Sequence, residues 1–275
     1  MELLTASLLF ILGSIIGSFL SVITYRTHVK EKGIVSGRSK CPNCKEPIKW
    51  HNLIPIISWL ALRGRCGECG KKISSHYLVM EVSTGLLFLL AFTKWNFLQA
   101  IGSSVNPDFS HYAIDWQSLS TLIFYLIEFT FLAAIFFYDL IYKEIPDRFS
   151  LPAIAIAFVG GLLLNILSWQ EMLIGAAIIG GFFFLQFILS KGKWIGGGDI
   201  RLGILIGVLL GWKFGAVATI IAYFIGAILS MHLLLNKKVD RKTEIAFGPF
   251  LVAGTLIALF NGPELLEWYL RTMTF

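Results

Sequence analysis

Long stretches without a single charged side chain dominate this sequence and limit the folds open to it. Five of them are close to the roughly 20 residues that an α-helix needs to cross a bilayer. They are 3–25, 149–170, 172–190, 214–235 and 245–263. Charged residues make up 15% of the chain, against about 25% in soluble domains, and the mean hydropathy is +0.74. An all-α polytopic membrane protein is therefore expected.

Three further apolar segments are less clean and bring the expected number of transmembrane helices to about eight. They are 77–93 with Glu81 inside, 116–138 with Glu128 inside, and the short segment 202–212. Two stripes of small residues at four-residue spacing, Gly13/Gly17/Ser21 and Gly203/Gly207/Gly211, are typical of helix faces that pack closely on a neighbouring helix.

Positive charge is concentrated in one loop, which sets the expected orientation of the chain. Residues 24–76 hold eleven Lys and Arg against three acidic residues, whereas the whole chain holds 23 against 17. Because basic loops are retained on the cytoplasmic side, we expect this loop in the cytosol and the N-terminus outside. The loops near 139–148, 191–201 and 236–244 are then cytosolic too. The same charge favours anionic membrane lipid, and no nucleic-acid partner is expected, since no such binding motif is present.

All four cysteines lie in this basic loop as two CxxC pairs, Cys41/Cys44 and Cys66/Cys69, separated by 21 residues. Two pairs at such a spacing are typical of four thiolates that bind one zinc ion tetrahedrally. Cytosolic thiols stay reduced, which argues against disulfides, but four free thiols or a redox-active pair are alternatives. Four sulfur ligands leave no open coordination position, so a structural zinc site is expected in a small domain at 26–76.

Two carboxylates stand at the cytosolic ends of apolar stretches. Asp139 ends one stretch, and Asp199 follows the three glycines Gly196, Gly197 and Gly198. The expected topology puts both aspartates on one side of the membrane. A close pair shares a proton, so one carboxylate can act as general base on water while the other donates a hydrogen bond to a scissile carbonyl. For each aspartate alone, a helix cap or an ion-pair partner is the alternative.

Asp147 and Arg201 flank the two aspartates. Asp147, after Pro146, is a weaker catalytic candidate, because it can cap the next span or pair with Arg148 or Arg201. Glu81 is an intramembrane carboxylate near the cytosolic end of its span, where it can face the four-cysteine domain. We name Glu81 as the candidate for contact with a cofactor, and the sequence assigns no other cofactor contacts.

Taken together, these motifs resemble those of the bacterial type IV prepilin peptidases, which belong to the GxGD aspartyl proteases of membranes. The resemblance covers nearly the whole chain. It rests on residues 17–26, with Ser21 where Asn is usual; the two CxxC pairs; 52–60; 62–66; 73–81, with His76 and Leu78 for Arg and Pro; 138–147; 196–202, with Arg201 for Lys; and 247–251.

The resemblance implies an enzyme of the bacterial inner membrane with its active site at the cytosolic face. It implies that Asp139 and Asp199 form the catalytic pair, supported by Asp147, Arg201 and the three glycines. Members of the family remove the short basic leader from type IV pilin or pseudopilin precursors. Many also methylate the new N-terminus with S-adenosylmethionine, an activity associated with the cytosolic part after the first transmembrane helix.

The implied domains are a first transmembrane helix at 1–25, a methyltransferase-associated four-cysteine domain at 26–76 and a helical peptidase core at 77–275. One alternative is a GxGD protease that cleaves other membrane helices. Another is a non-enzymatic transporter or assembly scaffold, in which the aspartates conduct protons or cations. The four-cysteine loop and the Ile-Pro-Asp motif at 145–147 favour the prepilin peptidase, and the oligomeric state stays open.

Overall fold

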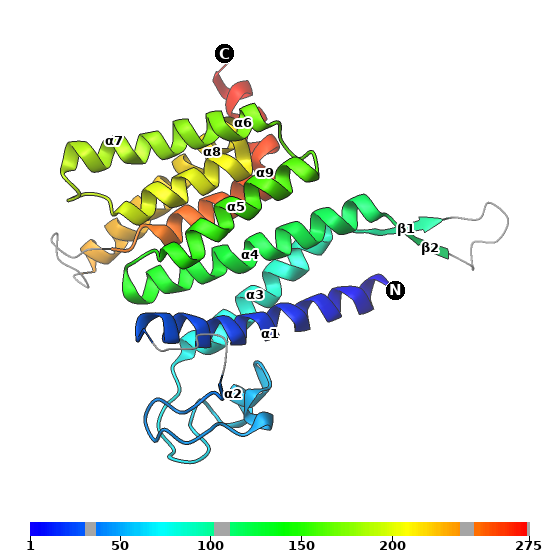
Figure 1. The fold of residues 1–275 in the computed structure, drawn as a ribbon, viewed down its shortest axis with the longest axis vertical. Coiled ribbons are helices and arrows are strands. Elements are labelled where there is room, and N and C mark those ends of the chain that lie inside the picture. The colour runs from blue at the N-terminus through cyan, green and yellow to red at the C-terminus, as the bar shows by residue number, and fades with distance from the viewer. Residues whose placement is uncertain (31–36, 102–110, 237–244, 274–275) are drawn as a thin grey trace. The chain divides into compact units, whose positions relative to one another are not determined.

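A computed structural model describes residues 1–30, 37–101, 111–236 and 245–273, and most of its elements are helices (Figure 1). In chain order they are α1 (Glu2–His28), η1 (Trp50–Leu53), α2 (Ile57–Ala61), α3 (Ser75–Lys94), β1 (Leu98–Ile101), β2 (His111–Ile114), α4 (Trp116–Tyr142), α5 (Asp147–Leu163), α6 (Trp169–Gly175), η2 (Ala176–Gly180), α7 (Gly181–Ser190), α8 (Gly197–Leu235) and α9 (Gly248–Met273). The expected helical multi-pass membrane fold is confirmed, with one added feature: β1 and β2 pair as a short antiparallel hairpin. Most of the expected cytosolic loop at 236–244 lies outside the described residues.

The expected count of eight transmembrane helices is not confirmed. Within the described ranges, six helices are long and apolar enough to cross a membrane. They are Glu2–His28, Ser75–Lys94, Trp116–Tyr142, Trp169–Ser190, Gly197–Leu235 and Gly248–Thr272. Two differences account for the count: α5 is only 17 residues long, and the expected spans 202–212 and 214–235 are joined in α8.

Gly211 interrupts α8. Its φ of 68° and ψ of −179° leave the helical region, a conformation that glycine adopts at little steric cost. The 39 residues of α8 would be about 58 Å long as one unbroken helix, nearly twice the hydrocarbon thickness of a bilayer. The break therefore divides α8 into two shorter helical segments. Gly211 was expected on the same close-packing face as Gly203 and Gly207. Although its backbone is not helical, it still lies against α6, because a Cβ atom on Gly175 would be 2.9 Å from the carbonyl carbon of Gly211.

The chain divides into two compact units, Met1–Ala133 and Ala134–Phe275. In the first unit, α1 packs against α3 along the predicted glycine stripe. A Cβ atom on Gly13 would lie 2.7 Å from the carbonyl oxygen of Thr84, and a Cβ atom on Gly17 would lie 2.7 Å from that of Met80. Only glycine permits so close an approach of the two backbones, so the small-residue face of α1 is confirmed.

In the second unit, the helical run α6–η2–α7 packs on the first part of α8. Gly175 and Gly207 meet backbone to backbone, and Gly203 lies against Phe183. The predicted packing role of Gly203 and Gly207 is therefore confirmed. The second part of α8 packs on α9, where a side chain at Gly254 would overlap the backbone of Ala218. Large side chains buried in this unit include Phe183, Leu202, Leu205, Ile206 and Leu251.

The Gly175–Gly207 contact predicts an asymmetric effect of two otherwise equal substitutions. Gly207→Ala should destabilise the protein by about 1–3 kcal/mol, because the new methyl group overlaps the backbone of Gly175. Gly181→Ala is the matched control: Gly181 is also helical, and nothing lies within 4 Å of the added Cβ atom. Thermal unfolding of both variants in the same detergent measures the difference. Equal stability of the two variants would contradict the packing of α6 on α8.

Candidate active site and metal cluster

Asp139 lies near the C-terminal end of α4, where a distant segment of the chain meets it. Its Oδ2 atom accepts a hydrogen bond of 2.9 Å from the backbone N–H of Gly248, the first residue of α9. A Cβ atom on Gly248 would stand 2.6 Å from the same oxygen, so this position requires glycine. Asp139 is only 5% exposed. The contact therefore holds a buried carboxylate through a backbone dipole, and no cation pairs with Asp139 among the described residues.

Asp199 lies in the first turn of α8 and is 8% exposed. Its Oδ2 atom accepts a hydrogen bond of 3.0 Å from the backbone N–H of Gly196, directly before the helix. The capping role that the sequence left open for Asp199 is thus present in the structure. One oxygen of the carboxylate serves the cap, which leaves the other for chemistry, so a capping contact and a catalytic role are compatible.

Asp139 and Asp199 both belong to the second unit, and their carboxylates interact electrostatically. Ile145 links the segments that carry them. A Cβ atom on Gly198 would lie 2.7 Å from Cβ of Ile145, and one on Gly248 would lie 3.2 Å from its Cδ1 atom. Gly198, next to Asp199, and Gly248, which holds Asp139, therefore lie against the same apolar side chain, although the two aspartates are 60 residues apart in sequence.

Arg201 ties the segment 145–147 to α8. Its Nη2 atom lies 2.7 Å from Oδ1 of Asp147 and donates a hydrogen bond of 3.2 Å to the backbone carbonyl of Ile145. Of the two pairings expected for Asp147, the one with Arg201 is present. Asp147 is also the first residue of α5, so its charge favours the start of that helix. Arg201 therefore positions the segment whose Ile145 side chain contacts Gly198 and Gly248.

The three glycines before Asp199 differ in their surroundings. Gly198 lies against Ile145, whereas nothing lies within 4 Å of a Cβ atom placed on Gly197. Gly196 donates its N–H to Asp199. Gly198 thus serves packing and Gly196 serves the cap. Gly197 leaves open space directly beside the turn that carries Asp199.

The sequence-based interpretation missed a hollow beside the Gly248 contact. It has a volume of about 240 Å³ and is lined by Tyr223, Gly226, Ala227, Ser230, Ile245, Phe247 and Phe250. The Tyr223 hydroxyl donates a hydrogen bond of 3.0 Å to Oε1 of Gln186, and its ring lies 4.9 Å from that of Phe247. Phe247 directly precedes the N–H that holds Asp139. In the sequence, only the resemblance of 247–251 to the family's closing motif pointed to this region.

In the first unit, the four cysteines come together as predicted. Their sulfur atoms all lie within 4.8 Å of one another, and Sγ of Cys41 is 4.0 Å from Sγ of Cys69. Four thiolates about 2.3 Å from a tetrahedral ion would be separated by about 3.8 Å, so the set fits such a metal. Both CxxC pairs fold alike: Lys45 N–H donates to Cys41 O and Gly70 N–H donates to Cys66 O, each at 2.9 Å.

Backbone N–H groups favour the thiolate forms of Cys41 and Cys69, whereas burial and the neighbouring sulfur atoms raise the pKa of Cys44 to about 11. The N–H of Lys71 and the side chain of Asn43 lower the pKa of Cys69 to about 6. The N–H of Cys44 lowers the pKa of Cys41 in the same way. An ion pair of 2.8 Å between Lys49 and Glu68 joins the segments of the two pairs. This electrostatic environment suits a metal that binds deprotonated sulfur.

Glu81 lies on α3, in the second turn of the helix, and is 7% exposed. Its Oε2 atom accepts a hydrogen bond of 2.7 Å from the backbone N–H of Ile56. The predicted contact between Glu81 and the four-cysteine loop is therefore present. The sequence carried no indication that Ile56 would be the partner.

Comparisons with known proteins agree over both units. The model of the bacterial peptidase A24 N-terminal domain matches residues 11–95, and that of the type IV leader peptidase family matches residues 126–231. Proteins named prepilin leader peptidase/N-methyltransferase are similar to the chain over nearly its full length. The protein from Aeromonas hydrophila is 31% identical over 96% of this chain and 93% of its own length. The one from Bacillus subtilis is 31% identical over 96% and 98%.

A third relative of the same name, from Aeromonas salmonicida, is 30% identical over 97% of this chain and 94% of its own length. No solved structure matches the chain. Since these similarities extend across the segments that carry the aspartates and the cysteines, the chain belongs to the type IV leader peptidase family.

Proposed function

We propose that this multi-pass membrane protein is an aspartyl endopeptidase that removes the basic leader from type IV pilin-like precursors. We propose further that it methylates the new N-terminus with S-adenosylmethionine. The observation that carries the peptidase function is that Asp139 and Asp199 are both buried, that each is held by one backbone N–H, and that Gly248 and Gly198 beside them lie against the same Ile145 side chain. The names of the relatives support both activities.

The proposed chemistry follows from the shared proton of the pair. Two neighbouring buried carboxylates cannot both be ionised at low cost, so one stays protonated. The ionised aspartate takes a proton from water, and the neutral one donates a hydrogen bond to the scissile carbonyl. Because the two carboxylates titrate as a pair, the roles of base and hydrogen-bond donor are not assigned to one aspartate or the other. The single hydrogen bond to each carboxylate leaves oxygens free for both tasks.

Topology and charge suit a precursor with a basic leader and an apolar helix. In the bacterial inner membrane, with the aspartates at the cytosolic face, the leader would lie near anionic lipid and near Glu144 and Asp147. The apolar helix would stay in the bilayer. The open space at Gly197 supports an extended substrate segment beside Asp199. For this division between methylation and cleavage we propose a first transmembrane helix at 1–25, a methyltransferase-associated domain at 26–76 and a peptidase core at 77–275.

The four-cysteine cluster is proposed to hold a structural zinc ion. Cys41, Cys44, Cys66 and Cys69 would fill its coordination sphere, so that the metal cross-links the loop and takes no part in the reaction. The protein side chains and backbone N–H groups around the sulfurs supply the electrostatic support described above.

The catalytic pair predicts the effect of two isosteric substitutions. Asp139→Asn and Asp199→Asn should each lower leader cleavage by about 100-fold or more, because the amide can neither share a proton nor act as a base. The assay incubates purified variants with a precursor pilin and follows leader loss by mass. Unchanged elution and thermal unfolding control for the fold. Substantial cleavage by either variant would remove that residue from the pair.

The contacts of Arg201 predict that a neutral replacement lowers kcat more than a positively charged replacement does. Arg201→Gln should lower kcat by about 10-fold, because the segment 145–147 loses its anchor and the geometry at the aspartates loosens. Arg201→Lys keeps the charge and should restore most of kcat. Cleavage kinetics that separate kcat from KM measure both variants. A purely structural role would instead lower the stability of both while leaving kcat per folded molecule unchanged.

The cluster predicts about one zinc ion per chain by metal analysis of the purified protein. Protons compete with the metal for thiolates, so zinc should be retained at about pH 7.5 and its retention should fall as the pH is lowered. Cys69→Ser should abolish retention even at neutral pH. Metal-free protein that is folded and active at neutral pH would contradict the assignment.

A further inference from the structure

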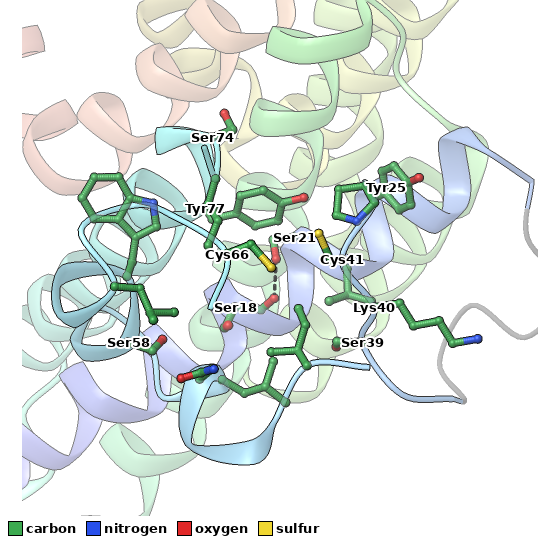
Figure 2. Close-up of a pocket in the computed structure, with 18 of the residues that line it drawn as sticks. Ser18, Ser21, Tyr25, Ser39, Lys40, Cys41, Ser58, Cys66, Ser74 and Tyr77 are labelled. Atoms are coloured by element: carbon green, nitrogen blue, oxygen red, sulfur yellow. Dashed lines mark hydrogen bonds between the residues drawn. The ribbon is translucent and has the colours of Figure 1, made fainter. Parts of the chain in front are cut away.

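A large cavity lies within the first unit, between α1, the four-cysteine loop and α3. Its volume is about 630 Å³, within the range of small-molecule sites. Figure 2 shows Ser18, Ser21 and Tyr25 of α1, Tyr77 of α3 and the loop residues Cys41 and Cys66 around it. The metal cluster thus forms part of the wall, and the membrane helices form another part.

Among the described residues that line this cavity, Glu81 is the only carboxylate. Its Oε2 atom is taken by the N–H of Ile56. Within the described residues, Oε1 accepts no further hydrogen bond and no cation pairs with Glu81. A buried carboxylate is costly without a positive partner, so the site is incomplete in a way that a cation would complete.

The backbone around Ile56 is strained to make this arrangement. Ile56 has a φ of 63° and a ψ of −56°, and the N–H of Ile57 donates to the carbonyl of Pro55 at 2.6 Å. This is the rare γ-turn with positive φ, which is unfavourable for a β-branched residue. Strain of this kind persists where surrounding contacts impose it, often at ligand sites. Here the turn directs the N–H of Ile56 to Glu81 and thereby fixes one carboxylate oxygen.

The other charges on the cavity are positive and come from the loop and the end of α1. They are Arg26, Arg38, Lys40, Lys71 and Lys72. Arg26 is committed to the loop, because its Nη2 atom donates to the carbonyls of Gly37 and Arg38 at 3.3 and 3.4 Å. Aromatic and aliphatic side chains, including Phe19, Trp59 and Tyr77, supply the remaining surface. The cavity thus offers one anion, several cations and aromatic faces.

A ligand that matches this pattern carries a cation, a carboxylate and an aromatic ring. We propose that the cavity binds the sulfonium methyl donor S-adenosylmethionine. Oε1 of Glu81 would lie against the sulfonium, the basic loop side chains near the carboxylate of the donor, and the aromatic side chains near its adenine base. This proposal rests on the methylation half of the proposed function. In the transfer, the methyl carbon leaves sulfur and bonds to the amine nitrogen of the processed substrate. The sulfur becomes a neutral thioether, and the amine releases a proton to solvent.

An anionic lipid headgroup is the competing ligand, since the cavity borders α1 and carries basic side chains. It fits less well, because Glu81 would repel it and would remain without a positive partner. The sulfonium donor accounts for the carboxylate and the cations together.

The charge of the sulfonium makes the test specific. Calorimetry measures the binding of S-adenosylmethionine and of its thioether product, S-adenosylhomocysteine, to the purified, metal-loaded full chain in detergent. Glu81→Gln should weaken donor binding by about 10- to 100-fold and product binding much less, because only the donor carries the sulfonium charge. Leader cleavage by the same variant should persist. Glu128→Gln, which alters a buried carboxylate that does not line the cavity, should leave both affinities unchanged.

Unchanged donor affinity in Glu81→Gln would overturn the proposal, and equal weakening of donor and product would overturn the sulfonium contact. Should Glu81→Gln fail to fold, Ser58→Leu fills the cavity from the small helix α2. Loss of donor binding in Ser58→Leu supports the site. Full donor binding by Ser58→Leu would show that the donor does not bind in this cavity. Displacement of the donor by phosphatidylglycerol, in the wild type and in Ser58→Leu, would favour a lipid ligand and overturn the proposal. If the wild-type protein does not bind the donor at all, the proposed methylation function is rejected. The peptidase function is tested independently by the leader-cleavage assay.

Discussion

Three buried carboxylates, Asp139, Asp199 and Glu81, are each held by a single backbone N–H, and the chemistry proposed for this protein depends on that arrangement. A cation beside each would neutralise it and fix it as a structural ion pair. A backbone N–H instead orients one oxygen and leaves the other available. Each donor is supplied by a special piece of backbone: the start of α9 for Asp139, the turn before α8 for Asp199 and the γ-turn at Ile56 for Glu81.

Glycine makes this arrangement sterically accessible. Gly248 allows the start of α9 to approach Asp139, and Gly198 allows the first turn of α8 to approach Ile145. The same residue type brings whole helices together at the Gly175–Gly207 and Gly17–α3 contacts. Because helix association in a bilayer gains little from the hydrophobic effect, close backbone packing must supply much of the stability. Close packing thus serves both the stability of each unit and the placement of its carboxylates.

Features with a local sequence pattern were predictable, and features that depend on distant segments were not. The two CxxC pairs and the glycine stripe of α1 follow from spacing alone, and the four-cysteine cluster and the α1–α3 contact are as expected. The N–H of Gly248 at Asp139 and the N–H of Ile56 at Glu81 join residues 109 and 25 positions apart. The sequence around Asp139 or Glu81 does not predict which distant backbone N–H group will be the hydrogen-bond donor. Likewise, the count of spans differed because α5 is only 17 residues long and because the segments 202–212 and 214–235 belong to one helix, α8, and composition determines neither feature.

The central claim is that Asp139 and Asp199 work as a pair that shares one proton. The most direct test is the pH dependence of kcat/KM for leader cleavage by the purified protein. A singly protonated pair predicts a bell-shaped profile: activity falls at low pH, when no base is left, and at high pH, when no proton remains to polarise the carbonyl. A profile that rises to a plateau and stays level at high pH would show that a single ionised carboxylate suffices, and would contradict the account.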